Sequence, residues 1–174
     1  MLTSCGASVS TATVTGPAAY VDPYIGSGGH GHVFVGASVP FGAIQAGPQN
    51  IHKGWDWCSG YHHSDSIVIG FAHTHLSGTG CTDMGDVQIM PYTGELRSKR
   101  GRQEDIGGSC SSYYSHDNES VSPGYYSLKM DNGVRIEMTA STRTALHRIT
   151  YPEAEGRRLL INLEEGNGDG AYDT

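Results

Sequence analysis

Residues 125–141, YYSLKMDNGVRIEMTAS, decide the fold, because two runs of alternating apolar and polar residues flank an Asp-Asn-Gly turn. Alternation with a period of two is typical of a strand that buries one face. Asn-Gly between two such runs favours a hairpin, with positive φ at both central turn positions. The stretch therefore predicts an antiparallel hairpin whose buried face carries Tyr126, Leu128, Met130, Val134, Ile136 and Met138.

Four further runs repeat the strand pattern on both sides of the hairpin. They are short and rich in β-branched or alternating apolar residues: Ser66–Ala72, Asp86–Tyr92, Ala145–Tyr151 and Arg158–Leu163. No window of about 12 residues shows the 3.6-residue period of an amphipathic helix. Many short strands separated by turns predict an all-β fold, built as an antiparallel sandwich or a barrel-like sheet.

The composition narrows the function classes. The chain has 174 residues, of which 25 are glycine, and its 11 basic and 18 acidic residues give a net charge of −7. An acidic chain is a poor ligand for nucleic acid or for an anionic membrane through bulk electrostatics. No stretch approaches the roughly 20 apolar residues of a transmembrane helix. We therefore expect a soluble, loop-rich domain with neither a nucleic-acid partner nor a transmembrane segment.

The first 19 residues resemble the remnant of an export signal followed by a tether. Leu2-Thr3-Ser4-Cys5 is similar to the end of a bacterial lipoprotein signal, in which the cysteine is lipidated, although no charged or apolar segment precedes it. The stretch Gly6–Ala19 is small, uncharged and low in complexity, as flexible tethers are. These features predict a tether over residues 1–19, lipidation at Cys5, and a secreted, periplasmic or lipid-anchored protein.

The first loop that could carry chemistry is the glycine-rich stretch 26–36, GSGGHGHVFVG, which contains His30 and His32. A phosphate-binding loop would follow a strand, open a helix and carry a lysine near its end. No helical pattern follows this loop, and the first lysine of the chain is Lys53. We therefore interpret its glycines as residues that allow sharp turns and close approach of a ligand.

The second loop, residues 54–65 (GWDWCSGYHHSD), holds both tryptophans of the chain. Strand alternation would place Trp55 and Trp57 on one face and Asp56 on the other. Two tryptophans on one face can form a flat platform for sugar rings, since the indole is a large rigid plate. The same arrangement suits a buried core plug, because tryptophan is highly buried on average. The residues alone leave both interpretations open.

The third loop, residues 71–86 (FAHTHLSGTGCTDMGD), contains His73 and His75, which would share a face on a strand. Two histidines on one face are a plausible pair of metal ligands, and the three loops together hold six of the nine histidines. None of the established zinc spacings is present, and Asp83 and Asp86 lack the acidic density of a calcium loop. A histidine-rich metal-binding protein remains an alternative hypothesis.

Taken in order, these loops resemble the start of glycoside hydrolase family 92. The resemblance covers the chain from about Tyr20 to its last residue. It rests on VDPYIG at 21–26, GGHGH at 28–32, VPFG at 39–42, GWDWCSGYH at 54–62, GFAHTHLSGTGC at 70–81, SPGYY at 122–126 and RTALH at 143–147. Members of this family are calcium-dependent, inverting, exo-acting α-mannosidases, many of them specific for α-1,2 linkages.

The resemblance implies a two-part enzyme in which an N-terminal β-sandwich precedes a helical (α/α) barrel, with the mannose pocket between them. Residues 20–174 would form the sandwich, incomplete at its C-terminal end, and the helical domain would be the partner. That domain would carry the catalytic carboxylates and most ligands of Ca²⁺, so we expect no catalytic residue and no metal ligand in this chain, and no activity from it alone.

The implied substrate is a mannose-containing glycan, and the implied contacts of this chain with it are Trp57, Trp55, Cys58, Gly29 and His30. His73 and His75 would then support the loops from behind. The alternative with a similar platform is an independent carbohydrate-binding β-sandwich module.

Overall fold

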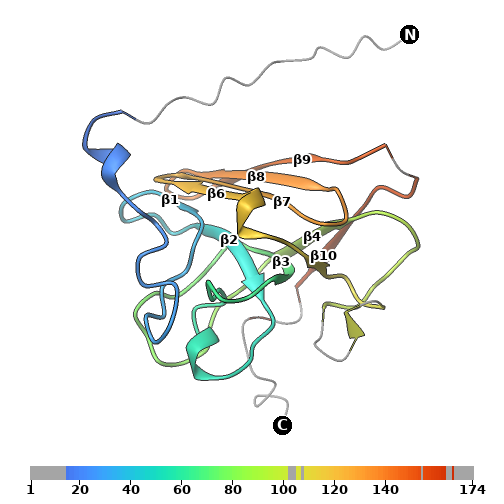
Figure 1. Ribbon diagram of the computed structural model, residues 1–174, viewed down its shortest axis with the longest axis horizontal. Helices are drawn as coiled ribbons and strands as arrows, with labels where there is room; N and C mark the ends of the chain where they lie inside the picture. The colour runs from blue at the N-terminus through green and yellow to red at the C-terminus, as the bar shows by residue number, and fades with distance from the viewer. Residues whose placement is uncertain (1–14, 102–104, 107, 154, 164–165, 167–174) are drawn as a thin grey trace.

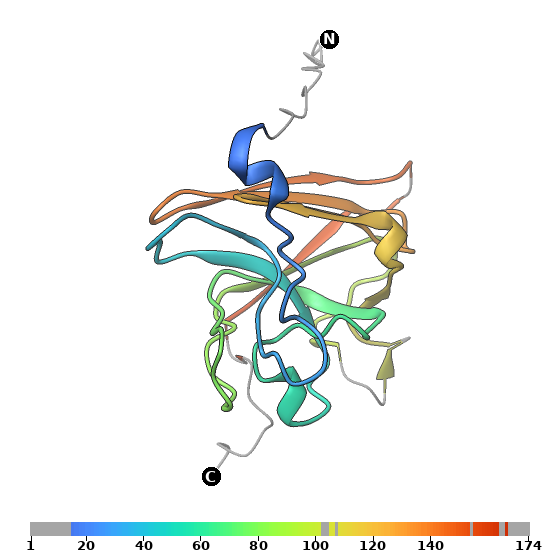
Figure 2. The same cartoon turned by 60° about the vertical axis from the view of Figure 1, so that its left-hand side comes forward.

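The computed structural model describes residues 15–101, 105–106, 108–153, 155–163 and 166. Two antiparallel sheets lie one above the other, as Figures 1 and 2 show from two directions. The expected antiparallel β-sandwich is therefore confirmed. The predicted lipidation site, Cys5, and the first part of the predicted tether lie outside the described residues.

The first sheet carries the three loops that the sequence singled out. Its strands follow the order β1-β2-β3-β4-β10, with β5 paired to β3, and every pairing is antiparallel. The strand bounds are β1 (Ala37–Ser38), β2 (Gln45–Asn50), β3 (Ile67–Ala72), β4 (Gln88–Tyr92), β5 (Ser112–Tyr113) and β10 (Arg158–Asn162). Three of these, β3, β4 and β10, fall within the runs that the alternation predicted.

The second sheet is a meander in the order β6-β7-β8-β9. Its strands are β6 (Glu119–Ser122), β7 (Tyr125–Lys129), β8 (Arg135–Ala140) and β9 (Ala145–Thr150). The predicted hairpin is β7 and β8, with Tyr126 opposite Met138 and Leu128 opposite Ile136. The expected turn geometry is wrong in one respect: of the central residues only Gly133 has positive φ, at 83°. The Gly133 N–H bonds the Met130 carbonyl, so the loop is a turn that ends in a left-handed glycine.

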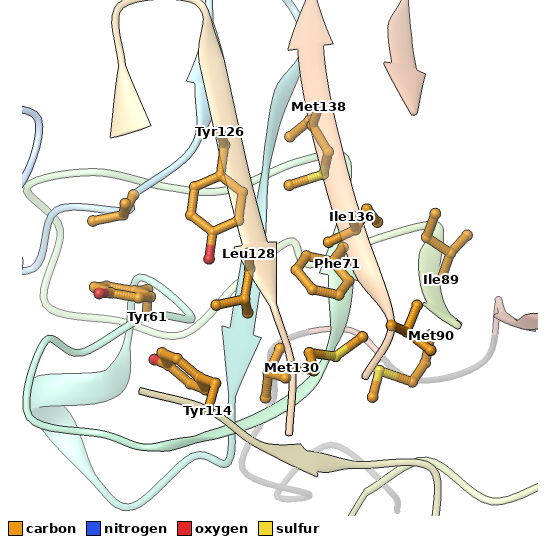
Figure 3. Packing of buried hydrophobic residues seen from close by; sticks show 14 of the residues in the cluster. Tyr61, Phe71, Ile89, Met90, Tyr114, Tyr126, Leu128, Met130, Ile136 and Met138 are labelled. Carbon is orange, nitrogen blue, oxygen red and sulfur yellow. The ribbon is translucent and has the colours of Figure 1, made fainter. Parts of the chain in front are cut away.

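The core lies between the two sheets (Figure 3). All six residues predicted for the inner face of the hairpin are at most 1% exposed. Phe71 of β3 and Met90 of β4 meet them from the first sheet. A side-chain period of two explains this result, because one register places every apolar residue of the hairpin on the same side.

Short 3-10 helices occur outside the sheets: η1 (Gly16–Tyr20), η2 (Trp55–Trp57) and η4 (His116–Asn118). Helix η1 includes residues 16–19 of the predicted tether, and none of its residues is buried. Pro17 is compatible with this helix, since its fixed φ suits the first helical turn. Among the described residues no helix is long and apolar enough to cross a membrane.

Phe41 occupies a strained turn between β1 and β2. Its φ is 58°, the Gly42 N–H bonds the Val39 carbonyl across the turn, and its side chain is fully exposed. A left-handed conformation costs a non-glycine residue roughly 1–2 kcal/mol. We predict that Phe41→Gly raises the free energy of unfolding by about 0.5–1 kcal/mol, after the greater chain entropy of unfolded glycine is subtracted. Urea denaturation measures this, and Phe41→Ala, which keeps the strain, should show no gain.

Candidate functional site

The three loops singled out from the sequence meet on the side of the first sheet that faces away from β6–β9 (Figure 2). We name them the glycine loop (26–36), the tryptophan loop (54–65) and the histidine loop (73–86). Backbone bonds join the glycine loop to both others: the Gly78 N–H donates to the His32 carbonyl and the His63 N–H to the Ser27 carbonyl, each at 2.8 Å. The loops therefore form one joined surface.

Side chains of the tryptophan loop bind the backbone of the histidine loop. The Trp55 indole N–H donates to the Gly80 carbonyl and the Cys58 thiol to the Thr79 carbonyl, both at 2.9 Å. Cys58 is buried, and this burial raises the pKa of its thiol. It therefore remains a neutral, compact residue beneath the loops.

Trp55, Asp56 and His30 form the exposed part of the surface, and the buried His32 packs beside them. Trp55 is 58% exposed, and the His32 ring packs against it in a T-shaped contact with centroids 4.2 Å apart. His30 Nδ1 lies 2.6 Å from Asp56 Oδ1, and His32 Nε2 lies 3.5 Å from the same oxygen. The hydrogen bond from His30 holds the pKa of Asp56 below its usual value. The result is an aromatic plate beside a carboxylate–imidazole pair.

Trp57 is held more tightly than Trp55. Its ring stacks on His62 with centroids 4.4 Å apart and an interplanar angle of 25°. Its indole N–H donates to Asp65 Oδ2 at 2.9 Å, and Lys53 Nζ lies 5.7 Å from its ring centroid. Trp57 is thus half-buried, whereas Trp55 is presented to solvent.

The expected strand through the two tryptophans is wrong. They are the first and last residues of η2, and a 3-10 helix turns by about 120° per residue, so positions two apart do not share a face. Gly54, with φ of 122°, breaks the extended chain just before them. Asp56 consequently lies on the joined surface of the three loops. Strand alternation had predicted that it would lie on the face opposite the two tryptophans.

All five predicted sugar-contacting residues lie in the joined loops, although Cys58 is buried beneath them. The Gly29 carbonyl lies 3.2 Å from His62 Nε2, which ties the glycine loop to the ring beneath Trp57. The sequence did not predict that Asp56, Asp65 and Lys53 take part in the contacts of this site. Asp56 and Lys53 stand beside the tryptophans in the sequence, which was a usable signal, whereas Asp65 lies eight residues beyond Trp57 and gave none.

His73 and His75 do not act as a pair. Strand β3 ends at Ala72, and beyond it His73 Nε2 lies 2.9 Å from His147 Nε2 of the opposite sheet. His75 turns inward, where its Nδ1 donates to the Gln45 carbonyl and its ring stacks on Phe34. Within the described part of the chain no three His, Cys, Asp or Glu residues are grouped to hold a metal ion. This geometry gives no support to the histidine-rich metal hypothesis.

Gly31 is the residue of the glycine loop with the least room. A Cβ at this position would lie 2.0 Å from the Gly26 carbonyl oxygen, whereas one at Gly28 would meet only His63 Cβ at 3.6 Å. Gly31→Ala must therefore push the loop open around His30 and His32. We expect the free energy of unfolding, measured by thermal denaturation, to fall by about 1–3 kcal/mol. Gly28→Ala is the matched control and should be nearly neutral; equal losses in both variants would contradict the prediction.

Buried histidines make this region sensitive to acid. Burial lowers the pKa of His75 from 6.5 to about 4, and burial with the charge of His73 does the same for His147. The unfolded chain therefore binds more protons between pH 6.5 and 4, so the free energy of unfolding falls as the pH is lowered through that window. His75 alone contributes on the order of 3 kcal/mol. Urea denaturation at several pH values measures the slope, which His75→Phe should reduce; an unchanged slope would refute the assignment.

Residues 20–174 match the family model described as the glycosyl hydrolase family 92 N-terminal domain. An uncharacterized secreted glycosidase of Arthroderma benhamiae is 32% identical and aligns with 83% of this chain and 19% of its own length.

Solved structures agree with this match. A family GH92 alpha-mannosidase of Bacteroides thetaiotaomicron, in complex with mannoimidazole, superposes with a TM-score of 0.78 at 42% identity, over 83% of this chain and 19% of that one. An inverting GH92 mannosidase of the same species gives 0.68 at 29% identity, with the same coverage. The chain thus spans about a fifth of the length of the relatives it matches.

Proposed function

This chain belongs to glycosyl hydrolase family 92, and from that premise we propose that it supplies one wall of the sugar pocket of an exo-acting α-mannosidase. The joined surface of the three loops would contact the terminal mannose of a glycan. A helical domain would close the pocket from the other side. We refer below to this chain joined to that domain as the two-domain polypeptide.

The observation that carries this proposal is the exposure of Trp55 beside a hydrogen-bonding pair. The apolar face of a pyranose packs on a flat aromatic ring, and Trp55 offers such a ring in a fixed orientation, because Gly80 and His32 hold it. His30 and Asp56 lie at the same surface and can bond sugar hydroxyls. Trp57 and Cys58 would form the base of this wall, and Gly29 permits close approach.

The reaction itself would use groups outside this chain. An inverting glycosidase needs a general acid and a general base roughly 6.5–9.5 Å apart, with a water molecule between the base and the sugar. We propose that the helical domain carries both carboxylates, and that this chain binds the sugar, orients it and excludes bulk water. The preference for α-1,2 linkages and the inverting outcome belong to the same proposal.

Calcium does not fit the residues of this chain by themselves. The ion prefers six to eight oxygen ligands, and the described residues hold no group of three acidic, histidine or cysteine side chains that could bind a metal. Asp56 is already engaged by His30. We propose that the ligands of Ca²⁺ come mostly from the helical domain, and we route no step through the ion.

Cellular location follows from the substrate in this proposal. A glycan-degrading enzyme meets its substrate outside the cytoplasm, so we propose a secreted, periplasmic or lipid-anchored protein. Protease accessibility in intact and lysed bacteria that express the two-domain polypeptide tests this; protection until the inner membrane is broken would contradict it.

Calorimetry separates the pocket domain from an independent carbohydrate-binding module, the alternative that the exposure of Trp55 keeps open. We expect the two-domain polypeptide to bind α-1,2-mannobiose with a submillimolar dissociation constant and this chain alone to bind it far more weakly. Submillimolar binding by the isolated chain, lost in Trp57→Ala, would favour the independent module instead.

A further inference from the structure

Asp65 lies at the end of the tryptophan loop, two residues before the start of β3, and its side chain is only 1% exposed. Its two carboxylate oxygens accept hydrogen bonds from different parts of the chain. Oδ1 accepts the backbone N–H groups of Ser66 and Ile67 at 2.8 and 3.1 Å, at the start of the strand. Oδ2 accepts the Trp57 indole N–H at 2.9 Å and the Lys53 ammonium at 2.8 Å. One carboxylate therefore joins the central sheet to the plate of Trp57.

The strand end of this link is rigid. β3 pairs with β2, β4 and β5, and every residue of it is buried. A side chain bonded to the first backbone N–H groups of such a strand has little freedom to move. The indole bonded to its other oxygen inherits that position, because an N–H···O bond constrains both the distance and the in-plane direction of the ring.

Lys53 makes the buried carboxylate tolerable. A buried negative charge is strongly unfavourable unless it is paired and its lone pairs are hydrogen-bonded. Lys53 supplies the opposite charge, while its own side chain remains 30% exposed. The four donors on Asp65 thus satisfy the charge, and His62, stacked on Trp57, fixes the tilt of the ring.

We propose that Asp65 is a positioning residue for the mannose pocket. Asp65 holds the indole of Trp57 in place, and Lys53 is its counter-ion. This inference rests on the proposed function, since it assumes that Trp57 lies in the sugar-binding wall. Asp65 itself does not touch the sugar; it acts through the orientation of the ring.

Asp65→Asn is the sharpest variant, because it damages only one side of the link. The amide oxygen can still accept the Ser66 and Ile67 N–H groups, and the amide NH₂ then faces the donors of Trp57 and Lys53. The indole loses its acceptor while the strand keeps its own. Lys53→Met is the matched control for charge, and Trp57→Phe keeps an aromatic ring but removes the indole N–H.

The first readout concerns the ring alone. In a Trp55→Phe background Trp57 is the sole tryptophan of this chain, so its fluorescence reports its own environment. We expect Asp65→Asn to shift its emission to longer wavelength and to increase its quenching by acrylamide, with far-UV circular dichroism unchanged. An unchanged emission spectrum would overturn the inference.

The second readout is a double-mutant cycle on the two-domain polypeptide with an aryl α-mannoside. We expect Asp65→Asn to raise KM about tenfold with a smaller change in kcat, and to have no further effect in a Trp57→Phe background. A purely structural role would lower kcat/KM by the same factor in both backgrounds and would overturn the inference, as would an unchanged KM. Absence of mannoside turnover in the unmutated two-domain polypeptide would instead refute the proposed function, while the fluorescence result would still decide the role of Asp65.

Discussion

Glu119→Leu is expected to destabilise the chain by about 3–5 kcal/mol, a large part of the roughly 5–15 kcal/mol that holds an ordinary domain folded. The Glu119 side chain is fully buried at the start of β6 and accepts three hydrogen bonds. The donors are the Tyr126 hydroxyl at 2.6 Å, the Tyr61 hydroxyl at 3.0 Å and His116 Nδ1 at 2.7 Å. Leucine would leave the buried hydroxyls of Tyr61 and Tyr126 without the acceptor that Glu119 provides, and each such loss costs about 1–3 kcal/mol.

The same residue connects the second sheet to the functional surface. Tyr61 belongs to the tryptophan loop, whereas Tyr126 belongs to β7 and His116 to η4. Burial, reinforced by the charge of Glu119, raises the pKa of both tyrosines well above the usual range, so they remain donors at every physiological pH. The tryptophan loop therefore depends on a carboxylate of the opposite sheet.

Urea denaturation followed by circular dichroism measures the effect of Glu119→Leu. Glu119→Gln is the matched control, because its amide oxygen keeps one acceptor and its volume is the same, so we expect a smaller loss. A loss below about 1 kcal/mol for the leucine variant would show that the network contributes little to stability.

Trp55→Ala in the two-domain polypeptide is expected to lower kcat/KM for an α-mannoside on the order of 100-fold. Tryptophan is enriched among the few residues that dominate a binding site, and its truncation to alanine there costs roughly 2 kcal/mol or more of binding free energy. Trp55 is 58% exposed and its indole N–H is bonded to Gly80, so its ring is both accessible and rigidly held. Steady-state kinetics with an aryl α-mannoside gives the value.

Two variants bracket this result. Trp55→Phe keeps a smaller plate without the bond to Gly80 and should lie between wild type and alanine. Leu146→Ala removes another exposed apolar side chain, on β9 of the second sheet, and should leave kcat/KM unchanged. Equal losses at Trp55 and Leu146 would indicate a general disturbance of the fold and would contradict the assignment of Trp55.

Strands β3, β4 and β7–β10 could be predicted from the sequence because their signal is local, whereas β1, β2, β5 and β6 fall outside the predicted runs. Tyr126, Leu128 and Ile136 alternate with polar residues, and a period of two leaves a single arrangement that buries them. The 3-10 geometry of η2 was not predictable in the same way, because Trp-Asp-Trp satisfies strand alternation equally well. Gly54 was the one local sign of a break.

The individual loops of the site could be predicted from the sequence, but the contacts that join them could not. Each loop is recognisable by its glycines, tryptophans or histidines, whereas the bonds that join them connect residues far apart, such as His32 with Gly78 and Cys58 with Thr79. Such pairings depend on where the strands deliver the loops, which composition and spacing do not encode. The divergence of His73 and His75 has the same origin, since it follows from the end of β3 at Ala72.

We propose that this chain is one wall of a mannosidase pocket that a second domain completes. The direct test is the release of mannose from α-1,2-mannobiose in the presence of calcium, measured side by side for this chain and for the two-domain polypeptide at equal concentration. We predict turnover by the two-domain polypeptide and none above background by the 174-residue chain. Clear hydrolysis by the purified 174-residue chain, or none by the two-domain polypeptide, would contradict the account.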